Sequence, residues 1–338
     1  MTDTPLLRVS DLCVSFRTPD GVVRAVDSVS FDVHAGETVG IVGESGSGKS
    51  VTANALMRLN FGAQVSTTGS ILLDGVDLGS LSEEEMRLRR GRDIAMVFQD
   101  PLSALNPFYS VGDQVAEAYR VHHPKARRPE MRDVVVESLG RVGIPEPIKR
   151  MQSFPHEFSG GMRQRIVIAM ALVNSPRLLI ADEPTTALDV TVQAQILELI
   201  QRIQQESGTA VLLITHDLGV IAETTERVIV MYGGRVVEEA SVESVFEQPT
   251  HPYTLGLLGS VRSLDSAGRG SLRAIPGSPP SLIHLPTGCA FRPRCRFELG
   301  EGSPCGTTVP TLSVAGHSRS ACHLDVTERE RLIAGVDG

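Results

Sequence analysis

The feature that most constrains this chain is a glycine-rich loop, Gly43–Ser50, which reads Gly-Glu-Ser-Gly-Ser-Gly-Lys-Ser. It fits the pattern G-x-x-x-x-G-K-[ST] of a phosphate-binding loop, with an apolar segment before it (Thr38–Val42) and a helical segment after it (Val51–Leu59). The glycines allow backbone N–H groups to turn toward phosphate oxygens, and the following helix presents the positive end of its dipole. Lys49 would reach the β- and γ-phosphates, and Ser50 would ligate Mg²⁺. We therefore predict a nucleotide site made of Gly43, Glu44, Ser45, Gly46, Ser47, Gly48, Lys49 and Ser50.

Short apolar segments and helical segments alternate around this loop. Residues Leu7–Val39 alternate apolar segments with turn signals, which indicates antiparallel strands. The segments that read as buried strands of a parallel sheet are Ile94–Phe98, Leu178–Ala181 and Val211–Thr215. The segments with helical spacing and no internal proline are Val51–Leu59, Val134–Val142, Met162–Asn174 and Val192–Ser207. This alternation predicts an α/β fold.

Length and composition limit the organisation of the chain. With 338 residues, it exceeds the size at which one hydrophobic core usually stops growing, so we expect a large domain over residues 1–260 and an appendage over residues 261–338. A Ser-, Gly- and Pro-rich linker is expected over Val261–Pro280. The net charge of −8 disfavours nucleic acid as a partner. The longest apolar run, Ile166–Val173, is too short to cross a bilayer and the N-terminus lacks a signal pattern, so a soluble, cytosolic chain is expected.

A pair of carboxylates, Asp182 and Glu183, ends the apolar segment Leu178–Ala181. Ligands gather at the carboxyl ends of strands in open α/β sheets. Asp182 would hold the Mg²⁺ shell and Glu183 would polarise the attacking water, as in phosphate-loop enzymes. The alternative is a solvated Asp-Glu turn before Pro184.

A second helix start with anion-binding character lies at Ser159-Gly160-Gly161, directly before a helical segment. Taken alone, this tripeptide is more simply an ordinary turn and helix cap. Its position upstream of Asp182, however, also favours a functional interpretation.

In this order, the motifs resemble those of the ABC transporter ATPases, in which the signature motif Ser-Gly-Gly lies upstream of the carboxylate pair. The resemblance implies a RecA-like core, an antiparallel β subdomain and an α-helical signature subdomain. It also implies that Gln99 is the glutamine that senses Mg²⁺ and water, that Asp189 of the run Ala187-Leu188-Asp189 belongs to the D-loop, and that His216 contacts the γ-phosphate. Phe16 would stack on adenine by its position, although a core phenylalanine is the alternative.

The resemblance implies that two such domains close head to tail. ATP on the phosphate loop of one chain would then be completed by Ser159, Gly160 and Gly161 of the other, so that nucleotide shifts the population toward the closed pair. Because Glu183 and His216 are both present, hydrolysis is expected. One departure is Met162, where most members have Gln, and its side chain cannot donate to the ribose.

Several stretches resemble the oligopeptide/dipeptide importer branch in particular. They are the run Phe98–Pro107, the sequence His251-Pro252-Tyr253-Thr254, and a C-terminal pattern Gly-Cys-x-Phe-x-x-Arg-Cys formed by Gly288, Cys289, Phe291, Arg294 and Cys295, followed by Cys305 and Cys322-His323. The implied function is ATP hydrolysis that drives peptide import, with nickel or sugars as other substrates of the branch. A non-transport ABC ATPase acting as a nucleotide-gated clamp is the alternative from another class. The implied partners are a second ABC ATPase, two transmembrane permeases and an extracytoplasmic substrate-binding protein, with this chain peripheral on the cytoplasmic face of the membrane.

Four of the five cysteines lie near the end of the chain, at Cys289, Cys295, Cys305 and Cys322. Disulfides are disfavoured in a reducing cytosol, which leaves metal binding or free thiols. Four thiolates satisfy a [4Fe–4S] cluster, which some members of the branch are thought to carry, whereas the spacing from Cys289 to Cys295 is longer than in most zinc sites. A cluster, zinc and unmetallated thiols therefore stay open here. Cys13 lies in an apolar strand and is expected to be a small core residue.

Overall fold

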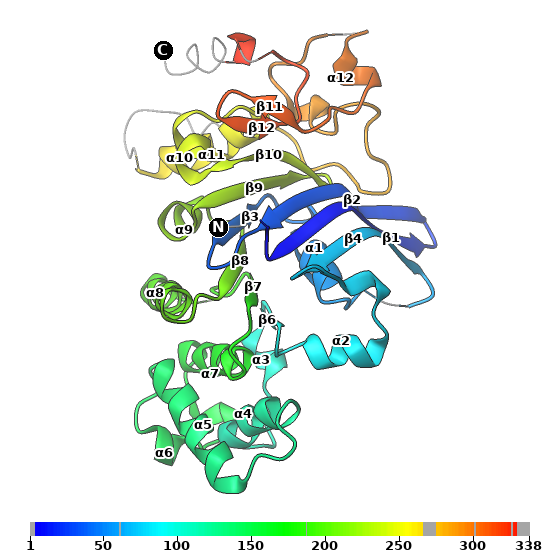
Figure 1. The fold of residues 1–338 in the computed structure, drawn as a ribbon. Coiled ribbons are helices and arrows are strands. Elements are labelled where there is room, and N and C mark those ends of the chain that lie inside the picture. The colour runs from blue at the N-terminus through cyan, green and yellow to red at the C-terminus, as the bar shows by residue number, and fades with distance from the viewer. Residues whose placement is uncertain are drawn as a thin grey trace. The chain divides into compact units, whose positions relative to one another are not determined.

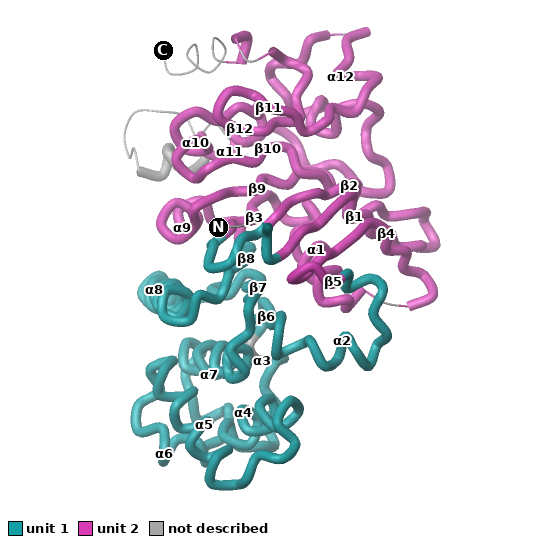
Figure 2. Tube along the Cα trace, viewed as in Figure 1, with its two compact units in different colours: residues 1–6, 33–38, 77–214 teal, residues 7–32, 39–76, 215–338 magenta. Residues whose placement is uncertain are grey.

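The computed structural model describes residues 4–60, 62–186, 188–265, 275–300, 302–325 and 327–329. They form two compact units, each assembled from separate stretches of the chain (Figure 2). Unit 1 comprises Met1–Leu6, Val33–Thr38 and Asp77–Ile214, and unit 2 comprises Leu7–Asp32, Val39–Val76 and Thr215–Gly338. The domain boundary at residue 260 stays a prediction, and residues 266–274 of the expected linker lie outside the described residues.

The core of unit 1 contains short parallel strands in the order β8-β7-β6. Every residue in them is buried, and nearly all are apolar, as expected for a parallel sheet covered on both faces. The sequence predicted these strands to within one residue at most of their ends. They are β6 (Ile94–Val97), β7 (Leu178–Asp182) and β8 (Ala210–Thr215).

Helices make up the rest of unit 1 (Figure 1). Helices α4, α5 and α7 contact one another and form the helical part of the unit. Helix α5 begins at Arg128, earlier than the predicted Val134, because its polar first turn shows no apolar periodicity and is started by a proline instead. The elements are η1 (Leu78–Ser80), α2 (Glu83–Arg89), α3 (Pro101–Ala104), α4 (Val111–Arg120), α5 (Arg128–Arg141), α6 (Pro147–Arg150), η2 (Pro155–Glu157), α7 (Gly160–Leu172) and α8 (Val190–Ser207).

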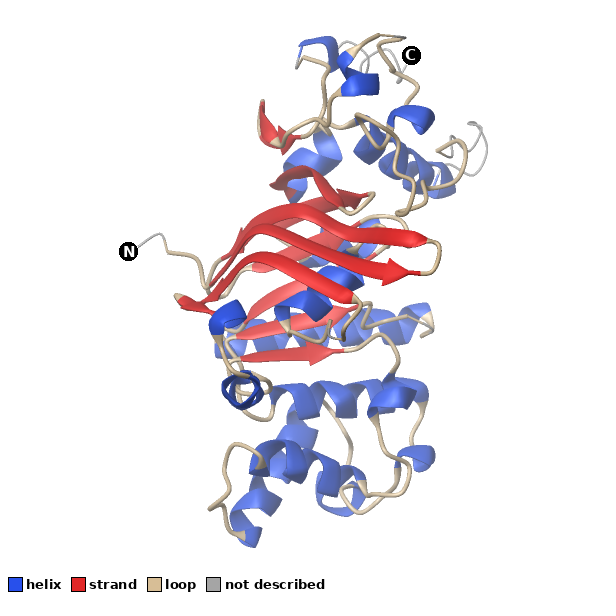
Figure 3. Ribbon diagram, turned by 90° about the vertical axis from the view of Figure 1, so that its right-hand side faces the viewer, coloured by secondary structure: helices blue, strands red, loops and turns tan. Residues whose placement is uncertain are grey.

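Unit 2 contains an antiparallel sheet with the strand order β2-β1-β4-β5. Its long, twisted strands are visible in Figure 3. The strands are β1 (Leu7–Thr18), β2 (Gly21–Val33), β4 (Val65–Leu73) and β5 (Val76–Asp77). The prediction of a core position for Cys13 is wrong. A bulge between Ser10 and Cys13 shifts the pairing with β4, and the half-buried thiol accepts a hydrogen bond from the Ser28 N–H at 3.2 Å.

A second set of strands in unit 2 has the order β3-β9-β10-β12-β11. Strands β3 and β9 are parallel and buried, and β10 pairs antiparallel with both β9 and β12. The cysteine-bearing C-terminal region therefore adds two strands to the edge of this sheet. The strands are β3 (Thr38–Val42), β9 (Arg227–Tyr232), β10 (Arg235–Ser241), β11 (Ser313–Ala315) and β12 (Ser318–Ser320).

The helices of unit 2 are short apart from α11. They are α1 (Lys49–Leu56), α9 (Leu218–Thr224), α10 (Val242–Glu247), α11 (Pro252–Asp265), η3 (Arg292–Arg294) and α12 (Pro304–Thr307). Over the parts of the chain that the structure describes, no helix combines the length and the apolar composition needed to traverse a bilayer.

Candidate functional site

The phosphate loop of unit 2 has the backbone that its glycines predict. Gly48 adopts a φ of +103° and caps the start of α1. A Cβ at Gly48 would lie 2.4 Å from the carbonyl oxygen of Ala25, and one at Gly43 would lie 2.2 Å from that of Met231. Both positions therefore require glycine for conformation and for space.

The polar groups of the loop turn inward. The Lys49 side chain is buried, and its Nζ donates to the carbonyl oxygens of Gly43 at 2.7 Å and Glu44 at 3.1 Å. Its ammonium group thus lies across the loop, where a phosphate would meet it. The Ser47 hydroxyl is buried and makes no hydrogen bond to any described residue. A buried polar group of this kind is expected to have a partner, and a phosphate oxygen could supply it.

A second group of predicted residues meets in unit 1. The Glu183 carboxylate accepts hydrogen bonds from Gln99 Nε2 at 3.0 Å and from Thr186 Oγ1 at 2.8 Å. The Glu183 backbone has a φ of +47°, which is unusual for a residue with a side chain, and its N–H donates to the Ile214 carbonyl at 2.8 Å. Asp182, one residue earlier, is buried at the end of β7. The alternative of a solvated Asp-Glu turn does not fit this arrangement.

Two helices of the same unit begin at predicted site residues, one at a serine and the other at an aspartate. Ser159 caps α7, with its hydroxyl accepting from the Met162 N–H at 3.3 Å, and Asp189 caps α8, accepting from the Val192 N–H at 3.0 Å. The helix-cap interpretation of Ser159 is therefore confirmed. Gly161 also has a packing role, because a Cβ there would lie 2.4 Å from Val192 Cγ1. Ser159, Gly160 and Asp189 are nevertheless exposed, so a second chain could reach them. Ala187 lies outside the described residues.

The remaining predicted residues lie in unit 2. His216 is exposed directly after β8, followed by Asp217, whose carboxylate caps α9 at the N–H groups of Gly219 and Val220. Phe16 lies near the end of β1 opposite Val65 and is half-buried, which fits an accessible ring better than a core residue. Ser50 lies in the first turn of α1.

Two residues with no predicted role in the site, Tyr253 and Arg294, contact the phosphate loop. The Glu44 backbone N–H donates to the Tyr253 hydroxyl at 2.8 Å. The Glu44 carboxylate accepts a two-pronged hydrogen bond from Arg294, at 2.6 and 3.0 Å. Both residues belong to sequence patterns noted above, but nothing in the sequence indicates that they reach this loop.

The C-terminal cysteines are free thiols, all partly exposed. Burial and the neighbouring thiols of Cys322, Cys289 and Cys305 raise the pKa of Cys295 to about 12. The Cys289 N–H donates to the Cys305 carbonyl at 2.9 Å. The cysteines are thus neighbours, but within the described ranges no three His, Cys, Asp or Glu side chains converge as a metal site would require. The donor set suits a soft metal in number and type, whereas its placement in this structure does not form a ready site.

Comparisons with known proteins agree with this geometry. Residues 26–186 match the family described as "ABC transporter", and residues 237–301 match "Oligopeptide/dipeptide transporter, C-terminal region". The chain is 54% identical over 335 residues to the dipeptide transport ATP-binding protein DppD of Bacillus subtilis, covering 98% of both chains. It is 52% identical over 297 residues to the oligopeptide transport ATP-binding protein OppD of the same organism, covering 88% of this chain and 83% of OppD.

Solved structures show the same fold. The dimeric ABC transporter cassette MJ0796, bound to ADP and Pi, superposes with a TM-score of 0.62 at 28% identity, covering 70% of this chain and 98% of the cassette. The cassette cbiO1 of Clostridium perfringens gives 0.61 at 28% identity, covering 78% of this chain and 99% of that one. These matches confirm the predicted α/β cassette fold, and the chain belongs to the ABC transporter family, among the oligopeptide and dipeptide transport ATP-binding proteins.

Proposed function

We propose that this chain binds Mg-ATP at Gly43–Ser50 and hydrolyses it to drive uptake of dipeptides or oligopeptides through partner permeases. The observation that carries the nucleotide site is the loop whose glycines tolerate no Cβ and whose lysine lies buried across it. ATPase activity is general in this family, and the relatives named for dipeptide and oligopeptide transport support peptides as the substrate class.

Each residue has a proposed role in hydrolysis. Lys49 neutralises the β- and γ-phosphates, while Ser50, Asp182 and Gln99 hold Mg²⁺ or its water shell. Glu183 orients and polarises the attacking water, and the hydrogen bond between its carboxylate and Gln99 supports that pairing. His216 contacts the γ-phosphate, and Phe16 stacks on the adenine.

The site is completed by a second ATPase subunit. Ser159, Gly160, Gly161 and Asp189 would face the nucleotide of the partner chain, and the dimeric cassette with bound ADP and Pi supports a pair of this kind. The positive end of α7 and the cap at Ser159 favour an anion at this helix start.

The permease subunits have a candidate docking surface within unit 1. A groove of about 1160 Å³ lies among α4, α5 and the residues around Met151. Exposed aromatic rings lie on it and next to it, with Phe108 85% exposed and Tyr109 58% exposed. Aromatic side chains of this kind commonly anchor protein interfaces. We propose that a cytoplasmic helix of the permease binds here, which would hold this chain peripherally on the cytoplasmic face of the membrane, in a complex that also contains an extracytoplasmic substrate-binding protein.

The test combines turnover with partner capture. Purified chain is expected to hydrolyse Mg-ATP, and Lys49→Ala is expected to lose that activity. Isolation from cells in detergent is expected to bring down membrane permeases. Recovery of nucleic acid in place of permeases would favour the clamp-type ABC ATPase.

We further propose that Cys289, Cys295, Cys305 and Cys322 bind a [4Fe–4S] cluster after local rearrangement. Their number, their mutual proximity and the soft character of thiolates support this proposal. Anaerobic purification should give a brown protein with broad visible absorption. Stoichiometric zinc in a colourless sample would show that the four cysteines bind zinc and not a cluster. Metal-free protein would show that they are free thiols.

A further inference from the structure

Glu44, the second residue of the phosphate loop, is held by a residue far along the chain. Arg294 donates from Nη1 to Oε2 at 2.6 Å and from Nη2 to Oε1 at 3.0 Å. The side chain of Arg294 is 5% exposed and that of Glu44 is 26% exposed. A two-pronged, largely buried pair of this kind is both strong and directional.

The guanidinium group is itself fixed on its other sides. Its Nε donates to the Pro276 carbonyl at 2.8 Å, and Nη1 also approaches the Tyr232 hydroxyl at 3.4 Å. Its central carbon lies 5.8 Å from the centre of the Tyr232 ring. Arg294 therefore has one well-defined position, and that position aims its fork at the phosphate loop.

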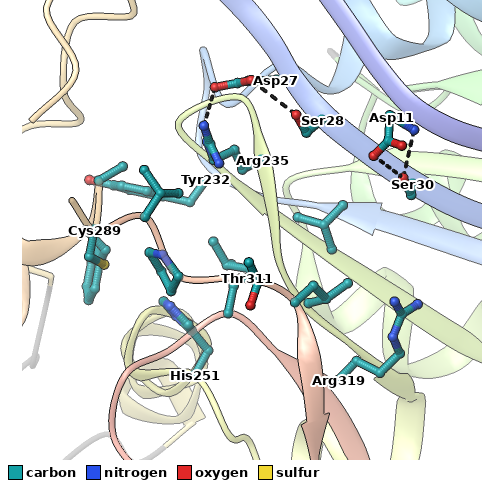
Figure 4. Close-up of a pocket in the computed structure, with 18 residues that line it drawn as sticks. Asp11, Asp27, Ser28, Ser30, Tyr232, Arg235, His251, Cys289, Thr311 and Arg319 are labelled. Atoms are coloured by element: carbon teal, nitrogen blue, oxygen red, sulfur yellow. Dashed lines mark hydrogen bonds and ion pairs between the residues drawn. The ribbon is translucent and has the colours of Figure 1, made fainter. Parts of the chain in front are cut away.

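The segment that carries Arg294, Gly288–Cys295, is anchored by aromatic packing. The Phe291 ring lies 5.2 Å from that of Tyr232 and 5.4 Å from that of Tyr253. Figure 4 shows Tyr232, His251 and Cys289 on the wall of a cavity of about 400 Å³, which Phe291 also lines. Tyr253 in turn accepts from the Glu44 N–H. The cysteine-bearing segment and the phosphate loop thus share one set of contacts.

The negative charge of the Glu44 carboxylate indicates how its contact with Arg294 bears on nucleotide binding. A triphosphate carries several negative charges, and a bare carboxylate on the loop that binds it would repel it. The carbonyl of the same residue accepts from Lys49 Nζ, so the position of Glu44 also bears on the position of the lysine. We propose that Arg294 is a positioning residue of the nucleotide site, which acts through Glu44 by neutralising its carboxylate and fixing the first turn of the loop. This inference rests on the proposed assignment of Gly43–Ser50 as the ATP site.

The experiment measures Mg-ATP affinity by equilibrium titration of the full chain, in the wild type and in Lys49→Ala, Arg294→Ala and Arg296→Ala. Loss of one partner of a buried charge pair is expected to weaken binding in Arg294→Ala by about tenfold or more. Arg296→Ala is the matched control, because Arg296 is exposed in the same segment and contacts Phe297. Its affinity should equal that of the wild type. Equal binding by the wild type and Lys49→Ala would overturn the site assignment and this inference with it.

A double substitution separates a role through Glu44 from a merely structural one. In a Glu44→Gln background the repelling charge is gone, so Arg294→Ala should lose no more than about twofold in affinity. Hydrogen exchange of residues 43–50 without nucleotide should also rise in Arg294→Ala alone. If Arg294→Ala does not yield folded protein, Arg294→Lys gives the same comparison with a smaller loss, because one amine cannot replace the fork. Wild-type affinity in the folded Arg294 variants, or an equal loss with and without Glu44→Gln, would overturn the proposal while leaving the ATP site intact.

Discussion

The two units hold their key carboxylates in different ways. In unit 1, Glu183 is bound by Thr186, three positions away, and by Gln99, 84 positions away. In unit 2, the Glu44 carboxylate is bound by Arg294, 250 positions away, while the Glu44 backbone N–H donates to Tyr253, 209 positions away. The first arrangement depends largely on a local turn, whereas the second depends on a C-terminal region that a minimal phosphate-loop domain does not need.

The largest expected effect is a loss of ATP turnover when the unit 1 carboxylate, Glu183, is replaced. Glu183→Gln keeps the shape of the side chain but removes its ability to take a proton, so ATP turnover should fall by at least about a hundredfold. Nucleotide binding should persist, because the phosphate loop is unchanged. Steady-state hydrolysis and ATP titration measure the two effects separately. Glu198→Gln, an exposed change on α8, is the control, and wild-type turnover in Glu183→Gln would show that another group activates the water.

In unit 2, a substitution that strains the backbone of the phosphate loop should weaken ATP binding. Gly48→Ala would place a Cβ 2.4 Å from the Ala25 carbonyl at a φ of +103°, and we expect more than about a tenfold loss of ATP affinity with about 2 kcal/mol or more of lost unfolding free energy. Gly46→Ala is the matched control, since it has a positive φ but no atom within 4 Å of the added Cβ. Gly46→Ala should lose only about 1 kcal/mol of unfolding free energy. Equal losses in both variants would show that conformation alone, without the close contact, decides the position.

A smaller change tests the local support of Glu183. Thr186→Val removes the hydroxyl that donates to the carboxylate, so kcat should fall by about tenfold while KM for ATP changes little. Thr186→Ser keeps the donor and should restore most of the activity. A rise in KM with unchanged kcat would mean that Thr186 supports binding and not the chemical step.

The comparison with the least bearing on ATP turnover concerns His251, which supports the unit 2 arrangement because its Nδ1 accepts from the Tyr253 N–H at 3.0 Å. Burial, followed by the charge of Arg329, lowers the pKa of His251 to about 3. The unfolded chain therefore binds a proton that the folded chain does not between about pH 6.5 and pH 3, so stability falls as the pH is lowered through this range. His251 contributes up to about 1.4 kcal/mol per pH unit to that slope.

His251→Asn offers an acceptor in place of Nδ1 and does not titrate, so its unfolding free energy should depend less steeply on pH. Denaturant unfolding at a series of pH values, compared between wild type and variant, measures the difference. Identical slopes between about pH 6.5 and pH 3 would mean that His251 is protonated in the folded chain as it is in the unfolded chain.

The contrast between the units also explains what the sequence could predict. The strands of unit 1 are continuous apolar runs, so their positions and the carboxylates at their ends were predictable from pattern alone. The phosphate loop was equally predictable, because its glycines and lysine act within eight residues. The partnership of Gln99 with Glu183 was expected only by resemblance, and the structure supplies the hydrogen bond.

Contacts across long stretches of chain were not predictable. The approach of Arg294 to Glu44 depends on how β9, α11 and the Phe291 ring pack, which no local pattern encodes. The exposure of Cys13 depends on a bulge at Asp11, whose positive φ of 49° the alternation of apolar residues does not reveal. The cysteine spacing indicated neighbouring thiols, but it could not indicate whether their side chains converge.

The separation between Glu44 and Arg294 has a consequence for the order of synthesis. A ribosome makes the chain from its N-terminus, and domains generally fold as their residues emerge. The long stretch Asp77–Ile214 of unit 1 is complete well before Arg294 is made, whereas Glu44 of the phosphate loop precedes that stretch and pairs with a residue 250 positions later. The phosphate loop is thus translated long before it is completed, so a nascent chain would not hold ATP firmly until Arg294 has been made.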